Sequence, residues 1–349
     1  MMDINAAWSD YCDGTYDVTQ KTYDTTPPQI APKCTDLYIS TKTKISYLSQ
    51  SIDINNVFWE IPVNEYHIPV EGIIKKQMKL NSHSETEFMV LHKKIANERT
   101  RHTYVEEHII QRIVNEDGRI KYKDVRKISV GLSKKDIISY RCKKKGAFYN
   151  CFVLIIRVKY NNVFKEIHVK IFNTGKLEIP GIQNDDLLVK TLDILINTIK
   201  QYVSPELTYD NSMTETVLIN SNFKCGYFID RERLFDIIKS KYNINSSYDP
   251  CSYPGIQCEF YYDSSITIQT GKKPITNDFT KVSFMIFRTG SVLIVGKCTE
   301  DILNKIYLFV RTMLETEFYE IHIPNMDGIL TCKPIAKKTS RKKTILIMK

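Results

Sequence analysis

Two phenylalanines, Phe172 and Phe287, occupy the same place in two similar hexapeptides of this sequence, IFNTGK (171–176) and IFRTGS (286–291). In each hexapeptide the phenylalanine ends an apolar segment, and a Thr-Gly pair follows one residue later. Glycine is favoured where the backbone must turn tightly, so each hexapeptide predicts a β-hairpin turn directly after an aromatic side chain.

The strands around the second turn are apolar on both faces, because side chains alternate along a strand. One face holds Ile286, Val292 and Ile294, and the other holds Phe287, Leu293 and Val295. We expect the first face to pack on helices. An apolar second face is unusual on a water-soluble sheet, and we interpret it as a binding surface.

The rest of the sequence argues against catalysis. We find no P-loop, no G-x-S-x-G motif, no paired metal-ligand cluster and no credible triad, so we expect no enzyme activity, no cofactor and no metal. A net charge of +9 over 349 residues suggests an anionic partner. Nine cysteines without a C-x-x-C pair suggest reduced thiols in an intracellular, reducing compartment. The longest apolar segment, CFVLII (151–156), is too short to span a bilayer, so we expect no membrane partner.

The hexapeptides belong to a longer internal repeat, in which residues 169–199 align without gaps to residues 284–314. Asn184 and Thr299 are matching candidate N-caps, each followed by two acidic residues that the helix dipole favours. Apolar residues then recur at helical spacing in both copies. These are Leu188, Leu192, Leu195 and Ile199 in the first copy and Leu303, Tyr307, Val310 and Leu314 in the second. A duplicated unit of hairpin and helix is therefore predicted.

Each copy extends upstream, which predicts an α+β fold of two pseudo-symmetric repeats. The first is expected to add strands at 36–48, 150–160 and 164–172 and a helix at 53–61, and the second strands at 215–223 and 255–263 and a helix at 231–242. The predicted organisation is a disordered N-terminal tail (1–35), repeat 1 (36–202) with an insertion (63–145), repeat 2 (203–320) and a basic C-terminal tail (321–349).

The segments YDPCSYPG (248–255) and MIFRTGSVLIVG (285–296), followed by a long helix, resemble the second repeat of the TATA-box-binding protein family. FVLIIRV and IFNTGKLEIPG are similar to its first repeat, and GIIKKQMK (72–79) is typical of the divergent members in large DNA viruses. The resemblance implies a saddle: one curved antiparallel sheet with helices on its convex face. The concave face of this family binds the DNA minor groove, and aromatic wedges enter between base steps.

The resemblance implies wedge roles for particular aromatic residues. Phe172 and Phe287 match the second wedge of each half, and Tyr253 matches the first wedge of the second half. In the first half that role falls on Phe148 or Tyr149, whereas strict spacing would give Cys151.

The resemblance also implies polar and apolar contacts with DNA. Asn220 or Asn222 would bond minor-groove acceptors, while the first half offers only Thr41 and Thr43. Apolar minor-groove contacts match Leu293 and Val295, and phosphate contacts match Arg157 and Lys176. Glu178, Pro180 and Val295 depart from the family pattern, which places a preference for TATA sequences in doubt.

The family recruits a transcription factor IIB-like factor and the RNA polymerase machinery, and Tyr248 and Asp249 match its partner-binding edge. We expect a monomer on double-stranded DNA, in the nucleus or in a cytoplasmic viral factory. The basic segment 121–145 is either a solvated face or an added phosphate clamp.

The leading hypothesis is a DNA-bending transcription initiation factor that acts in the minor groove. One alternative is a saddle-fold interaction scaffold that has lost specific DNA binding. A second is a glycosylase-like DNA-repair domain, which also has to open DNA.

Overall fold

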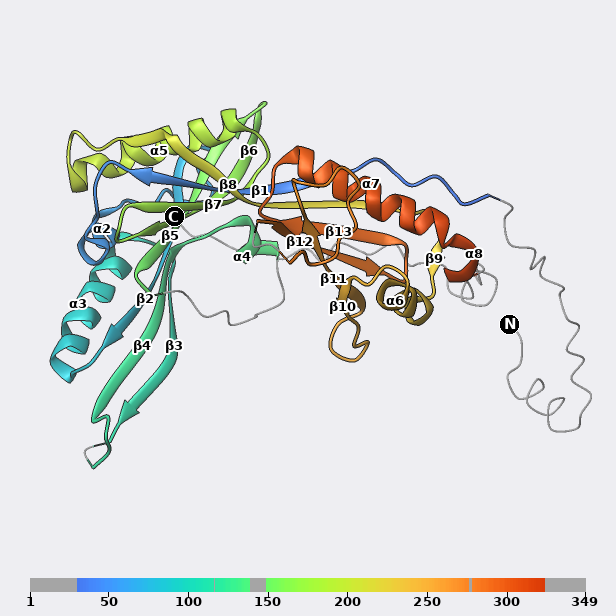
Figure 1. Cartoon of the computed structure of the whole chain (residues 1–349). Helices are drawn as coiled ribbons and strands as arrows, with labels where there is room; N and C mark the ends of the chain where they lie inside the picture. The colour runs from blue at the N-terminus through green and yellow to red at the C-terminus, as the bar shows by residue number, and fades with distance from the viewer. Residues whose placement is uncertain (1–29, 116, 139–148, 276–277, 324–349) are drawn as a thin grey trace, which may run out of the picture.

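The computed structural model describes residues 30–115, 117–138, 149–275 and 278–323. Its main feature is a single twelve-stranded antiparallel sheet, in the order β10-β11-β12-β13-β8-β1-β7-β6-β5-β2-β4-β3. Both ends of this sheet bend away from the long helices α5 and α7 (Figure 1). We call the side away from these helices the concave face. The predicted α+β fold with two repeats in one curved sheet is confirmed.

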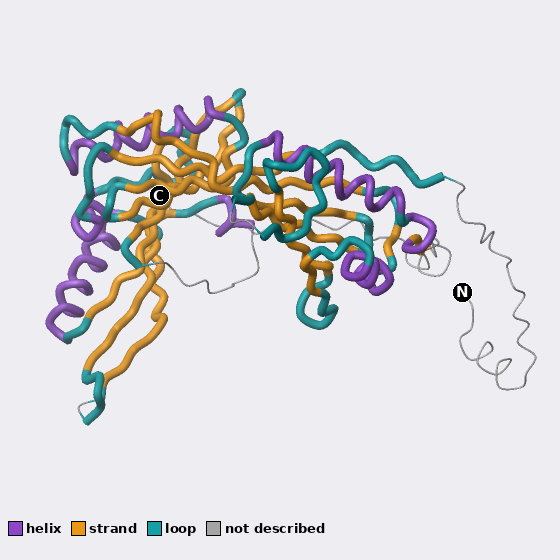
Figure 2. The backbone as a smooth tube through the Cα atoms, viewed as in Figure 1, coloured by secondary structure: helices purple, strands orange, loops and turns teal. Residues whose placement is uncertain are grey.

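The two halves meet at the neighbouring strands β1 and β8, where Lys42 lies opposite Ile219. The first half contains β1 (Tyr38–Leu48), α2 (Ile54–Glu60), β2 (Gly72–Ser82), α3 (Glu85–Arg101), β3 (Val105–Val114), β4 (Tyr122–Gly131), α4 (Lys134–Ile138), β5 (Cys151–Tyr160), β6 (Val163–Phe172), β7 (Lys176–Ile182) and α5 (Asp185–Val203). The second half contains β8 (Tyr209–Lys224), β9 (Phe228–Ile229), α6 (Arg231–Ser240), β10 (Asn245–Ser247), β11 (Gly255–Tyr262), β12 (Thr280–Phe287), β13 (Ser291–Gly296), α7 (Glu300–Thr316), α8 (Phe318–Ile321) and β14 (His322–Ile323). Figure 2 shows how strands form the span while the long helices α5 and α7 lie along its outer side.

Backbone hydrogen bonds repeat between the halves. The amide of Leu48 donates to the Gly175 carbonyl at 2.9 Å, and the amide of Cys225 donates to the Gly290 carbonyl at the same distance. A few residues later, Asp53 caps α2 by accepting two backbone amides, as Asp230 does for α6. The duplication predicted from the sequence is therefore a duplication of backbone geometry.

The hairpin glycines of the two hexapeptides are required by the backbone. Gly175 has φ +83° and Gly290 has φ +73°, in the left-handed region that side chains disfavour. A Cβ atom at Gly175 would lie 2.5 Å from the carbonyl oxygen of Gln50, and one at Gly290 would lie 2.2 Å from that of Tyr227. In each half, the chain that follows the first strand, at Gln50 or Tyr227, therefore passes directly over the hairpin turn.

Each half has its own hydrophobic core between the sheet and its long helix. Asn184 and Thr299 cap α5 and α7 as predicted, each accepting an amide three residues on. The eight apolar residues that recur at helical spacing in these two helices are all buried. This packing covers one face of the hairpins and leaves the other for the concave side.

The segment predicted as an insertion, 63–145, contains one strand that belongs to the repeat. β2 lies beside β5 just as β10 lies beside β11, so the elements unique to the first half are α3, β3, β4 and α4. β3 and β4 lengthen the first-half end of the sheet, with α3 along its outer side (Figure 1).

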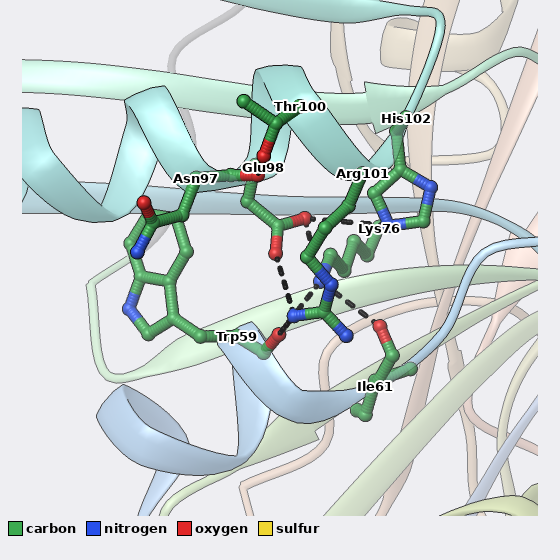
Figure 3. Close-up of polar contacts among 8 residues, drawn as sticks. All are labelled: Trp59, Ile61, Lys76, Asn97, Glu98, Thr100, Arg101 and His102. Atoms are coloured by element: carbon green, nitrogen blue, oxygen red, sulfur yellow. Dashed lines mark hydrogen bonds and ion pairs between the residues drawn. The ribbon is translucent and has the colours of Figure 1, made fainter.

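A buried ion pair attaches α3 to β2. Lys76 is fully buried, and its ammonium lies 3.0 Å from a carboxylate oxygen of Glu98, which is 2% exposed. The same ammonium donates to the carbonyls of Ile61 at 2.9 Å and Trp59 at 3.3 Å, at the end of α2 (Figure 3). Burial lowers the pKa of Lys76 despite the carboxylate. One charged group therefore joins three elements.

The folded part of the chain extends into both predicted tails, 1–35 and 321–349. Thr35 donates its amide to the Lys224 carbonyl at 2.9 Å, and Cys34 is buried in the second core, so the segment before β1 is packed rather than disordered. At the other end β14 pairs with β9, which extends the second half to Ile323. The rest of both predicted tails lies outside the described residues. None of the described helices is long and apolar enough to cross a membrane.

Candidate nucleic-acid interface

Strand register places the predicted contact residues of the second half on the concave face. Leu293 lies opposite Met285 and Asn222, and Val295 lies opposite Asn220. All five side chains are partly exposed, whereas their neighbours in the chain on β13, Val292 and Ile294, are fully buried. The second apolar face predicted from the sequence is therefore present, with two asparagines beside it.

The second half presents an aromatic pair at the end of this surface. The rings of Tyr253 and Phe287 are 5.9 Å apart at 61°, an edge-to-face arrangement. Gly255 lies opposite Phe287, and a Cβ atom there would lie 3.0 Å from that ring. The Tyr253 hydroxyl lies 3.6 Å from the Met285 sulfur. These contacts hold two aromatic rings together on a partly exposed surface.

Strand register in the first half shows which of the candidates Phe148, Tyr149 and Cys151 corresponds to Tyr253. Phe172 lies opposite Cys151 as Phe287 lies opposite Gly255, so Tyr149 corresponds to Tyr253. Tyr149 is exposed, and the Lys79 ammonium lies 3.6 Å from its ring centre. Cys151, the strict-spacing alternative, is buried. Phe148 lies outside the described residues.

Charge distinguishes the first half from the second. Glu178 lies opposite Lys170 and forms an ion pair with it at 2.5 Å, at the place where the second half has the apolar pair Met285 and Leu293. Both charged side chains are partly exposed. The negative charge that Glu178 brings to this face is thus partly offset by a neighbouring cation.

Thr41 and Thr43 of β1 are not both counterparts of the asparagines Asn220 and Asn222 of β8. Counting from the helix caps Asp53 and Asp230, the counterpart of Asn220 is Thr43, and the counterpart of Asn222 is Ile45. Thr41 instead lies opposite Asn220 across the junction of the halves.

The first half therefore has one polar group where the second has two, because Ile45 is 8% exposed and apolar. Asn222 donates its side-chain amide to the Ser40 hydroxyl at 2.7 Å, which fixes its orientation.

Arg157, predicted to contact phosphate, has a structural role here. It is 5% exposed, and its guanidinium donates to the carbonyls of Ile68 at 2.8 Å and Tyr66 at 2.9 Å. With two of its donors bonded to the loop before β2 and little of its surface exposed, the guanidinium is not available to a phosphate in this arrangement. Lys176, the other predicted phosphate contact, is partly exposed, and its ammonium lies 6.0 Å from the Phe172 ring centre.

The predicted partner-binding edge is connected to the aromatic pair. The Asp249 carboxylate accepts the Cys251 amide at 3.0 Å, and the Asp249 carbonyl accepts the Tyr253 amide at 2.9 Å. Hydrogen bonds from the Ser252 side chain and nearby backbone amides hold the pKa of Asp249 below its usual value. Tyr248 is partly exposed, with its ring 6.0 Å from that of Phe235. Asp249 therefore shapes the turn that carries Tyr253.

Sequence reasoning missed three members of the concave face: Met285, Ile45 and Lys170. Each becomes identifiable once strand register is known, because it lies opposite a residue that was predicted. Among the described residues, no group of three or more His, Cys, Asp or Glu side chains is placed to hold a metal ion.

Comparison with known proteins supports one relationship. No family model matches the chain. A TATA-box-binding protein-like protein of Acanthamoeba polyphaga mimivirus is 26% identical over 219 residues, which span 58% of this chain and 58% of the relative. Among solved structures, Methanococcus jannaschii TBP aligns with 81% of this chain and 99% of its own, with 12% identity and a TM-score of 0.38. The sequence similarity to the mimivirus protein confirms the predicted resemblance of this chain to the TATA-box-binding protein family.

Proposed function

We propose that the concave face binds double-stranded DNA in the minor groove and bends it, and that the chain acts as a transcription initiation factor. The observation that carries the proposal is the aromatic pair Tyr253 and Phe287, held partly exposed on the face opposite the core. Tyr149 and Phe172 occupy the matching register in the other half. Two symmetric aromatic sites on one curved sheet suit wedges that open the duplex at two base steps.

The surface between the aromatic sites has the chemistry of a minor-groove contact. Leu293 and Val295 offer apolar area to the sugars, and Asn220 can donate to the acceptors of A·T pairs. Unstacking costs a few kcal/mol per base step, and burial of the protein on the bent duplex offsets that cost. The site uses positioning and shape, with no chemical step.

Bending should be measured by energy transfer between the ends of duplexes selected from a random library. We expect the double variant Phe172→Ala/Phe287→Ala to lose most of the bending while keeping a salt-dependent encounter with DNA. Phe164→Ala is the matched control, because Phe164 is an exposed phenylalanine at the opposite end of β6. Equal bending by the double variant would remove the wedge role, and absence of DNA binding by the wild type would favour an interaction scaffold.

Recruitment of a transcription factor IIB-like factor and polymerase is the second part of the proposal, in the nucleus or in a viral factory. Tyr248 is a better probe of this edge than Asp249, because Asp249 also shapes the turn of Tyr253. Tyr248→Ala should weaken capture of the factor on preformed protein–DNA complexes and leave DNA affinity unchanged. Unchanged capture would count against this edge.

A further inference from the structure

We propose that β2 and β4 carry a lysine row, Lys79, Lys123 and Lys127, that binds phosphates of the duplex flanking the first-half aromatic site. The inference rests on the proposed function, since it concerns the path of the same duplex beyond the aromatic site. It extends the DNA-binding surface at the first-half end of the sheet only, largely on elements that the second half lacks.

Strand register places the lysine row on the concave face. Phe172 lies opposite Cys151, and Val153, two residues along β5, lies opposite Gln77. Lys79 follows Gln77 by two residues and lies opposite Lys127 on β4. Because side chains alternate along a strand, these residues share the face of Phe172. Lys123 is four residues before Lys127 on β4 and therefore lies on the same face.

The lysine row lies directly beside the first-half aromatic site. The Lys79 ammonium is 3.6 Å from the Tyr149 ring centre. A hydrogen bond from Lys79, together with the charges of Lys79 and Lys123, lowers the pKa of Tyr149. DNA that is kinked at Tyr149 and Phe172 would therefore meet these ammonium groups as it leaves the site.

Like charges gather here, and the carboxylates of Glu106 and Asp136 near Lys127 offset them only in part. Burial lowers the pKa of Lys127, and the Lys75 ammonium lowers it further. Asp136, one of the carboxylates near this group, forms an ion pair with Lys75 at 2.8 Å. Among the residues that the structure describes, no ion pair includes a member of the lysine row. A polyanion supplies the negative charge that such a surface favours.

The matching place in the second half has the opposite charge. Ser247 lies opposite Gln257 as Gln77 lies opposite Val153, so the counterpart of Lys79 is Asp249. Four residues before Asp249, Asn245 lies opposite Glu259, whose carboxylate accepts a hydrogen bond from the Asn245 amide at 2.6 Å and forms an ion pair with Lys281. The second-half end therefore has a carboxylate where the first-half end has Lys79, and flanking phosphates are attracted more strongly at the first-half end.

The test uses the full chain and the selected duplex, shortened at one end at a time. The triple variant Lys79→Gln/Lys123→Gln/Lys127→Gln removes the row. Its charge-matched control is Lys93→Gln/Lys200→Gln/Lys239→Gln, at exposed positions on the outer helices α3, α5 and α6. The variant Lys79→Arg/Lys123→Arg/Lys127→Arg keeps the charge and reports whether substitution alone disturbs folding.

Loss of three phosphate contacts should reduce the slope of log affinity against log salt by about 2.7. Wild type should lose affinity when one particular end of the duplex is removed, and the Gln variant should be insensitive to that end. The control and the Arg variant should behave as wild type. Bending by wild type with an unchanged slope in the Gln variant, or equal sensitivity to both ends, would overturn this inference alone. Absence of bending would overturn the proposed function first.

Discussion

The two halves of the concave face share their backbone and differ in their chemistry. In the second half, Met285 lies opposite Leu293 and Val295 lies opposite Asn220; in the first half, Lys170 lies opposite Glu178 and Pro180 lies opposite Thr43. The hairpin glycines, helix caps and crossing hydrogen bonds are the same in both halves. The residues that set the backbone are therefore alike in the two halves, while the residues of the exposed face differ.

The outer ends of the halves differ in the same way. The first half continues through β2, β4 and β3 with the lysine row, whereas the second ends at the three-residue strand β10 beside Glu259. For the proposed DNA-binding function, we infer that the second half provides most of the apolar wedge contact and the first half provides most of the electrostatic contact. Four predictions test this comparison.

The largest effect is expected at the buried pair that only the extended first half contains. Lys76→Met leaves Glu98 buried with its carboxylate partly uncompensated, and should lower the free energy of unfolding by about 3–5 kcal/mol. The double variant Lys76→Met/Glu98→Gln should recover much of this loss, because no unpaired charge remains. Chemical denaturation measures both, and hydrogen exchange should locate the change in α3 and β2. A single variant no less stable than the double would show that charge pairing is not the cause.

The hairpin glycines should show that the halves remain equivalent in their backbone. Gly175→Ala and Gly290→Ala should each lower the free energy of unfolding by about 1–3 kcal/mol, because both require a left-handed conformation. Gly290→Ala should cost more, since its Cβ atom would lie nearer a carbonyl oxygen. Ser291→Ala is a control at the following, partly exposed position. A tolerated alanine at only one of the two sites would break the symmetry described here.

The single wedge variants should reveal the difference between the halves. Phe287→Ala should weaken DNA binding by about tenfold more than Phe172→Ala, a difference of about 1.4 kcal/mol. Phe287 packs against Tyr253 and Gly255, and Tyr253 in turn contacts Met285, whereas a lysine lies near Phe172. Titration of labelled duplex at one fixed salt concentration measures the two losses. Equal losses would contradict the unequal division of apolar contact.

The smallest effect should come from making the first half resemble the second. Lys170→Met/Glu178→Leu replaces the ion pair by the residue types of Met285 and Leu293 without changing net charge. We expect a gain in DNA affinity of about threefold, because an exposed ion pair contributes little and apolar area is added to the contact. The salt dependence should fall slightly, since one ammonium group is removed from the proposed contact surface. A loss of affinity would mean that Lys170 contributes more than the apolar contact that replaces it.

Local patterns in the sequence were sufficient to predict the hairpins and long helices that the two halves share. The caps at Asn184 and Thr299, the glycine turns and the helical spacing of the core positions depend on interactions within a few residues, so they are readable without a structure. The aromatic positions Phe172 and Phe287 followed from the same hairpins.

Pairing between strands that are distant in the sequence decided which side chains lie together on the concave face. Register across β1, β7 and β8 made Thr43 and Ile45, rather than Thr41 and Thr43, the counterparts of the asparagines, and a loop before β2 enclosed Arg157. The lysine row exists only because β2 and β4 pair beside β5. A one-residue shift of register would move every side chain of a strand to its other face, and that register is set by long-range packing. The sequence alone determined the repeated units; tertiary structure determined which of their side chains share the concave face.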